Sequence, residues 1–260
     1  MKNVMKTILS KISFQSFWDV IFQLSLNRMN IGNGGNFRKS GEMYVAKHIQ
    51  KKLKNEQLIL IFDVGANTGN YSKSLSDIFK NKAKIFSFEP SKKTFDLFLD
   101  TTKNCENIIP NNFGFSDKSD HQILFSDSTG SGLASVYHRK LDHFGIKMDN
   151  TEEIELTTID TYCAENKIGR IHFLKLDIEG HELNALNGAK KMINDQKIDF
   201  IQFEFGGCNI DSRTYFQDFY YLLKDNYHIY RVLRNGIHKL PKYKETYEIF
   251  ITTNYLAVKK

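Results

Sequence analysis

Short apolar runs alternate with stretches of helical periodicity from residue 58 onward, and this alternation constrains the fold of the 260-residue chain more than any other feature. Leu58–Asp63 is a continuous apolar run closed by an acid, which is typical of a parallel strand buried on both faces. Tyr71, Leu75 and Phe79 then recur at the spacing of one helix face. Repeated units of this kind imply right-handed crossovers and a doubly wound, mostly parallel α/β sheet.

The pattern predicts seven strands, at Leu58–Asp63, Lys84–Phe88, Ile108–Phe115, His172–Leu176, Ile198–Phe203, Tyr227–Leu233 and Ile249–Val258. Polar or acidic side chains follow the carboxyl ends of the first five. Ligands bind at that edge of such sheets. The edge is therefore where we expect the functional residues, namely Asp63, Glu89, Ser116, Asp117, Asp177 and Glu204.

Residues 1–55 are expected to form a helical extension that packs on a core domain of residues 56–260. For the apolar helix around Phe14–Leu26 we favour packing on the domain, with peripheral membrane contact as the alternative. No stretch has the length of a membrane span or a secretory signal. The three scattered cysteines show no disulfide or zinc spacing, so a cytoplasmic location is expected.

The segment between Asp117 and His172 is longer than a crossover helix requires. Gln122–Phe125 and Glu153–Thr158 have strand character, and the small-residue loop Ser126–Ser135 follows the first of them. We expect an insertion over about residues 118–165, in the form of a hairpin or lid above the carboxyl edge of the sheet. Insertions at that place commonly shape a substrate pocket.

The turn after the first strand carries Asp63, Gly65, Asn67 and Gly69 in the pattern DxGxNxG. Glycines allow a tight turn and a close backbone approach to a ligand. The pattern differs from the GxGxxG that binds a pyrophosphate. S-adenosylmethionine has no phosphate, and its methionine carboxylate and ammonium need backbone donors and a carboxylate. We expect Gly65–Gly69 and Asp63 to supply them.

Glu89 ends the second strand, where an acid can accept both hydroxyls of a ribose. Ser116 and Asp117, after the third strand, are expected to meet the adenine edge. Each feature alone also has a structural interpretation, since glycine turns are common and an acid can simply begin a helix. Their combination favours S-adenosylmethionine as the cofactor.

Four segments of the chain together resemble the FkbM family of methyltransferases: Phe62–Gly69, Phe88–Pro90, Thr158–Asp160 and Leu174–Glu182. The similarity runs from about Ile59 to Phe205, and Asn30–Glu42 is similar to an extension of bacterial members. The resemblance implies a Rossmann-like class I methyltransferase fold and O-methylation, often of a sugar hydroxyl in a glycan, glycolipid or macrolide. It leaves the acceptor and the hydroxyl position open.

Methyl transfer to a hydroxyl requires in-line alignment and removal of the hydroxyl proton. We expect Asp177 to lie nearest the hydroxyl as base or orienter, with His181 as the alternative base because of its ordinary pKa. Lys175 is expected to be buried and paired with Asp177. Glu204 is expected to orient a sugar hydroxyl, whereas Glu182 is expected to complement a helix dipole.

A divalent cation is not favoured and no metal ligand is predicted. Asp177, Glu204 and one further acid would suit magnesium, but the acids are not clustered in the sequence.

The net charge of +6 is interpreted as a lysine-rich surface. An RNA or protein methyltransferase is the weaker alternative, because no proline-rich amino-methylation motif and no nucleic-acid-binding module are visible. A non-catalytic scaffold is the third hypothesis, although a scaffold would not need the polar groups at strand four. The expected partner is a small-molecule or glycan acceptor rather than a nucleic acid, and the oligomeric state stays open.

Overall fold

The computed structural model describes residues 14–260, so the start of the predicted extension lies outside the described residues. Its α-helices are α2 (Gln15–Arg28), α3 (Glu42–Lys52), α4 (Asn70–Phe79), α5 (Lys92–Thr102), α6 (Ile159–Glu165), α7 (Glu182–Asn187), α8 (Lys190–Asn194), α9 (Cys208–Ser212) and α10 (Phe216–Leu223). Its strands are β1 (Ile59–Val64), β2 (Ala83–Phe88), β3 (Ile108–Asn111), β4 (Gly114–Phe115), β5 (Asp120–Ser126), β6 (Asn150–Thr157), β7 (Ile171–Leu176), β8 (Ile198–Phe205), β9 (Tyr227–Leu233), β10 (Gly236–Lys239) and β11 (Thr253–Lys259). Short 3₁₀ turns lie at Lys80–Lys82, Asp142–Phe144 and Glu245–Tyr247.

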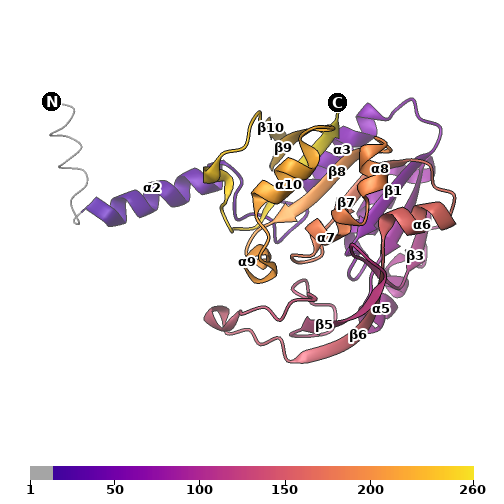
Figure 1. Ribbon diagram of the computed structural model, residues 1–260, viewed down its shortest axis with the longest axis horizontal. Helices are drawn as coiled ribbons and strands as arrows, with labels where there is room; N and C mark the ends of the chain where they lie inside the picture. The colour runs from indigo at the N-terminus through magenta and orange to yellow at the C-terminus, as the bar shows by residue number, and fades with distance from the viewer. Residues whose placement is uncertain (1–13) are drawn as a thin grey trace.

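Eight strands form the main sheet in the order β10-β9-β11-β8-β7-β1-β2-β3 (Figure 1). The strands from β8 to β3 are parallel, and β11 runs antiparallel between β8 and β9. The chain order reverses between β1 and β7, which is the switch point where such sheets bind ligands. The predicted doubly wound α/β fold is therefore confirmed. The strand that the sequence analysis missed is β10, a short and largely exposed edge strand without an apolar run.

The two faces of the sheet are buried in separate apolar cores. Successive residues of β1 alternate between them, with Phe62 in one core and Ile61 in the other, as the two-residue period of a strand requires. The first core includes residues of α6, α7 and α10, and the second includes residues of α3, α4 and α5. Burial on both faces explains why the central strands are recognisable as apolar runs.

The segment predicted as one third strand, Ile108–Phe115, is two strands in two sheets. β3 ends at Asn111 in the main sheet, and β4 pairs with β6 in a three-stranded sheet of order β4-β6-β5. At the break, the side-chain amide of Asn112 donates to the carbonyls of Glu89 and Pro90. The antiparallel pair β5–β6 is the predicted hairpin insertion, and it lies beyond the carboxyl edge of the main sheet (Figure 1).

The extension divides into two parts. α3 packs on the second core through Val45 and Ile49, whereas α2 projects away from the domain (Figure 1). Only Leu26 of α2 is buried, so the packing expected for Phe14–Leu26 is not seen. Within the described part of the chain, no helix is long and apolar enough to cross a membrane.

Candidate active site

A pocket lies where the carboxyl ends of β1, β2 and β7 meet the inserted sheet. Its walls are mainly apolar, and its polar side chains include the carboxylates of Glu89, Asp177 and Glu179. No lysine or arginine occurs among the described residues that line it. The lining comprises Val64, Gly65, Asn67, Glu89, Pro90, Thr94, Gly114, Phe115, Leu124, Ser131, Gly132, Ala134, Val136, Ile154, Leu156, Asp177, Ile178, Glu179 and His181.

Gly65 joins the predicted cofactor turn to the end of β7. Its φ is +82°, and a Cβ at this position would lie 1.9 Å from the carbonyl oxygen of Asp177. Any side chain would therefore collide with backbone and adopt a left-handed conformation. The contact explains the need for glycine and fixes the cofactor turn against Asp177.

The backbone amides of residues 65–69 already donate within the chain, which corrects the expectation that they bind a methionine carboxylate. Gly65 and Ala66 donate to the carbonyl of Phe88, and Gly69 donates to that of Ala66. The amide of Asn67 donates to Glu89 Oε2, and the next amide donates to the Asn67 side chain. In this arrangement the turn shapes the pocket without offering free donors.

Asp63 and Gly69 stand behind the pocket rather than in its wall. Asp63 is fully buried, accepts a hydrogen bond from Ser72 Oγ, and lies 3.9 Å from Lys175 Nζ. Burial raises its pKa, and the Lys175 ammonium opposes that shift. A Cβ on Gly69 would lie 2.8 Å from Thr102, so this glycine allows α4 to pack on α5. Neither residue lines the pocket, contrary to the direct cofactor contact expected for both.

Glu89 lines the pocket and is held in position by backbone donors. Its Oε1 accepts the Ser91 amide at 2.9 Å, and its Oε2 accepts the Asn67 amide at 3.0 Å. A carboxylate offers about four acceptor sites, so roughly two remain for a ligand. Burial raises the pKa of Glu89 to about 7, against these two hydrogen bonds.

Lys175 and Asp177 form the expected ion pair, with 2.9 Å between Lys175 Nζ and Asp177 Oδ2. Lys175 is buried, and its ammonium lies 4.7 Å from the centre of the Tyr71 ring. Burial alone would lower the Lys175 pKa, but Asp177, Asp63 and Glu42 together raise it above its ordinary value. Lys175 does not line the pocket, whereas the Asp177 side chain does and is 35% exposed.

His181 lies in the pocket wall with both ring nitrogens engaged. Nε2 is 2.9 Å from Ser116 Oγ, and Nδ1 is 3.0 Å from the Tyr137 hydroxyl. Burial lowers its pKa to about 4, so the ring is neutral near pH 7. The lowered pKa makes His181 a weaker base than an ordinary histidine, and its two contacts link Ser116 to Tyr137.

Ser116 and Asp117 do not line the pocket, contrary to the expected adenine contact. Ser116 follows β4 of the inserted sheet, and its hydroxyl contacts His181 and donates to Asp117 Oδ1. The wall near this point is instead made by Phe115 and Pro90. Because β4 belongs to the inserted sheet, both residues lie outside the pocket lining, and their contact with adenine stays a prediction.

The turn after β7 is strained and tightly capped. Glu179 and Gly180 have φ values of +51° and +104°, and left-handed backbone at a residue other than glycine concentrates at functional sites. The Glu182 carboxylate accepts the amides of Ile178 at 2.8 Å and Gly180 at 3.0 Å. Glu182 thus closes the turn that precedes α7, and the helix-dipole role expected for it stays a prediction.

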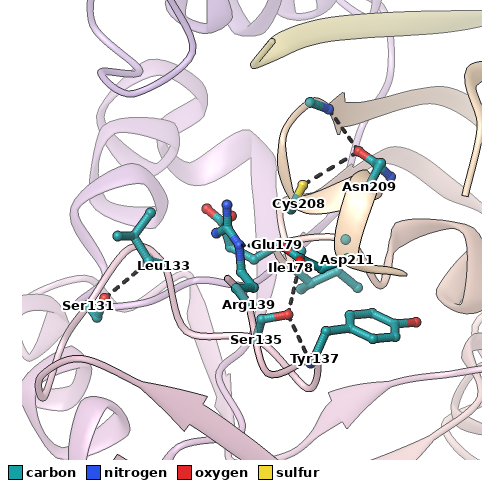
Figure 2. A network of polar contacts seen from close by, with 12 residues as sticks. Ser131, Leu133, Ser135, Tyr137, Arg139, Ile178, Glu179, Cys208, Asn209 and Asp211 are labelled. Carbon is teal, nitrogen blue, oxygen red and sulfur yellow. Dashed lines mark hydrogen bonds and ion pairs between the residues drawn. The ribbon is translucent and has the colours of Figure 1, made fainter. Parts of the chain in front are cut away.

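Arg139 clamps the insertion to this turn, as Figure 2 shows. Its Nη1 contacts the Glu179 carboxylate, its Nε lies 3.8 Å from Asp211 Oδ2, and its side chain is only 7% exposed. Ser135 Oγ also donates to the Glu179 carbonyl at 2.8 Å. Burial and the Asp177 charge raise the pKa of Glu179 to about 8, opposed by Arg139. Sequence reasoning missed Arg139 because its partner is forty residues away.

Glu204 is inside β8, is 7% exposed and does not line the pocket. Its carboxylate, that of Glu179 and the Cys208 thiol lie within 4.8 Å of one another. Burial, reinforced by Asp177 and Glu179, raises the Glu204 pKa well above its usual range. The grouping differs from the magnesium set considered from the sequence, and Arg139 already neutralises Glu179. We therefore propose no metal there.

A family profile described as the methyltransferase FkbM domain matches residues 63–234, about two thirds of the chain. The chain belongs to the FkbM methyltransferase family. This FkbM domain includes the pocket, the inserted sheet and the Arg139 clamp. The resemblance in the β1 and β7 motifs is thereby confirmed.

Two curated relatives are named as methyltransferases, and the name of the first specifies a sugar acid. The hexuronic acid methyltransferase AglP of Haloferax volcanii is 26% identical over 162 residues, which cover 62% of this chain and 61% of the relative. The 2-O-methyltransferase NoeI of Sinorhizobium fredii is 22% identical over 156 residues, covering 56% and 63%. The FkbM chain thus spans about six tenths of the length of these relatives.

Solved structures with a similar fold are more distant. An S-adenosylmethionine-dependent O-methyltransferase of Thermotoga maritima aligns with a TM-score of 0.42 at 10% identity, covering 83% of this chain and 65% of its own. A WbdD structure with a kinase inhibitor aligns with a TM-score of 0.48 at 8% identity, covering 86% and 41%.

Proposed function

We propose that the protein is an S-adenosylmethionine-dependent O-methyltransferase that methylates a sugar hydroxyl of a glycan, a lipid-linked saccharide or a related natural product. The observation that carries the proposal is the presence of Glu89 and Asp177 in one pocket at the switch point of the sheet. Membership of the FkbM family supports methyl transfer. The name of one relative, a hexuronic acid methyltransferase, supports a sugar acceptor, and the name of the other, a 2-O-methyltransferase, supports methylation of an oxygen. We place the reaction in the cytoplasm because all three cysteines are free thiols.

The pocket suits the nucleoside part of the cofactor through Glu89 and its apolar walls. Glu89 retains two acceptor sites for the two ribose hydroxyls, and Phe115, Ile154 and Leu156 offer apolar surface to an adenine. When bound, S-adenosylmethionine supplies an electrophilic methyl group on a sulfonium. The absence of a lysine or arginine from the described lining disfavours a dinucleotide pyrophosphate and supports a phosphate-free cofactor.

Asp177 is the residue that we assign to the acceptor hydroxyl. Its carboxylate is partly exposed to the pocket, and Lys175 fixes it from behind with a single contact at 2.9 Å. A positioned carboxylate orients the hydroxyl and accepts its proton as the oxygen forms the new bond. The neutral, doubly engaged His181 is a poorer candidate. Glu179, held by Arg139, closes the same end of the pocket.

The raised pKa of Glu89 leads to a pH prediction. An ionised carboxylate accepts ribose hydroxyls better than a protonated one, so affinity for S-adenosylmethionine should increase as pH rises through about 7. Glu89→Gln should weaken binding and remove most of this pH dependence. Calorimetric titrations from pH 6 to pH 8 measure both effects. An unchanged pH profile in the variant would contradict the assignment of Glu89 to the ribose.

Transfer of a labelled methyl group tests the proposed reaction itself. The full-length protein is incubated with methyl-labelled S-adenosylmethionine and sets of hexuronic acid oligosaccharides, N-acetylglucosamine oligomers, nucleotide sugars and total RNA. Base-stable label in a saccharide, at a hydroxyl identified by mass spectrometry, is the expected result. Label confined to RNA would support the alternative nucleic-acid methyltransferase. Binding of neither the cofactor nor its demethylated product would support a non-catalytic scaffold.

A further inference from the structure

Helix α2 presents a broad apolar face to solvent. Phe17, Ile21 and Leu24 follow the spacing of one helix side, and Val20 and Phe22 widen that side. These five side chains are 39–58% exposed. Soluble domains rarely leave a contiguous apolar patch of this kind uncovered. We therefore expect another surface to cover this face of α2 in the functional state.

The opposite side of α2 carries short polar residues, Gln15, Asp19 and Gln23. Around the helix the charge is strongly one-sided. Residues 1–41 contain six basic and one acidic side chain, so five of the net six positive charges lie in the first sixth of the chain. The positive charge that was interpreted as a lysine-rich surface is thus concentrated, in net terms, in this part of the sequence. A surface of negative charge is the complement of this segment.

We propose that α2 docks the protein on an anionic lipid surface, with its apolar face in the interface and with the net positive charge of residues 1–41 favouring the lipid headgroups. Fourteen residues of helix measure about 21 Å, which is too short to span a bilayer but suits an in-plane helix. A partner helix in a coiled coil would require a narrower apolar seam. A second copy of the chain would also leave the positive charge unexplained.

The loop that follows α2 reaches Glu204, which is grouped with Glu179 and Cys208 beside the candidate site. After α2, the Gly32 amide donates to the Thr252 carbonyl at 2.9 Å. A Cβ on Gly34 would lie 3.0 Å from Glu204 Oε2, so this loop covers the end of β8. A lipid-linked acceptor held at the bilayer would therefore lie close to the carboxyl edge of the main sheet, where the pocket is. This consequence alone rests on the proposed function.

Vesicle flotation of the full-length protein tests the docking. We expect binding to vesicles of phosphatidylcholine with phosphatidylglycerol, much weaker binding to phosphatidylcholine alone, and loss of binding at high salt. The double variant Phe17→Glu with Phe22→Glu should reduce the partition coefficient by at least about tenfold per residue. The matched control replaces Leu58 and Leu99 with Glu, since both are similarly exposed, at 43% and 40%, outside α2.

Three outcomes overturn the proposal. The first is failure of the folded wild-type protein to bind anionic vesicles, and the second is equal binding by the α2 variant and its control. The third is a wild-type dimer in sedimentation velocity that the α2 variant converts to a monomer without any vesicle binding, because a second copy would then cover the face. Vesicle binding requires neither cofactor nor acceptor, so its failure leaves the proposed methyl transfer untouched.

Discussion

Asp177→Asn is expected to lower kcat by about 10²–10⁴-fold, the range for loss of a positioned general base, while S-adenosylmethionine still binds. The amide keeps the shape of the side chain but accepts no proton. Lys175 retains the nearby Asp63 carboxylate, at 3.9 Å, as a counter-charge, so the fold should survive. Turnover is measured by formation of the demethylated cofactor, and affinity is measured by calorimetry on the same sample.

The control for this variant is Asp117→Asn, at an acid beside the site that does not line the pocket. It should keep a kcat close to that of the wild type. The assignment is wrong if Asp177→Asn turns over normally. It is equally wrong if the variant loses turnover only because cofactor binding is abolished.

Gly65→Ala is expected to reduce turnover by about 10²-fold, as a misplacement of about 1 Å does in an active site, and to lower the melting temperature. The added Cβ would lie 1.9 Å from the Asp177 carbonyl oxygen, and φ at this residue is +82°. The clash is with backbone, so no rotamer change relieves it and the end of β7 must move. Left-handed backbone adds roughly 1–2 kcal/mol of strain.

Gly169→Ala is the matched control, because a Cβ at Gly169 meets no atom within 4 Å and its φ is not in the left-handed region. It should leave turnover and melting temperature nearly unchanged. Thermal melts followed by circular dichroism distinguish unfolding of the variant from a displaced active site in a folded protein. Wild-type activity in Gly65→Ala would mean that contact between the cofactor turn and Asp177 is not required.

The central strands could be predicted because both of their faces are buried, which leaves apolar runs such as that of β1. The break between β3 and β4 could not, since it depends on Asn112 bonding to the backbone of another strand end. The exposure of α2 also could not be predicted. An apolar helix can be covered by its own domain or by another surface, and the sequence pattern is the same in both cases.

Within the candidate site, the locations of Glu89 and Asp177 could be predicted, because each residue directly follows the carboxyl end of a parallel strand. Asp63 could not be placed in the same way, since a strand-end acid can face the core, where Ser72 and Lys175 bind it. The environment of His181 comes from residues 44 and 65 positions away. Its lowered pKa comes from burial among such distant parts of the chain, and no local motif encodes that burial.

Calorimetric titration of the full-length protein with S-adenosylmethionine, with NADH titrated in parallel, tests the central claim most directly. Glu89, the apolar walls and the lack of a lysine or arginine in the described lining predict saturable one-site binding of S-adenosylmethionine and its demethylated product, with no heat from NADH. Binding of NADH in place of S-adenosylmethionine would contradict the account.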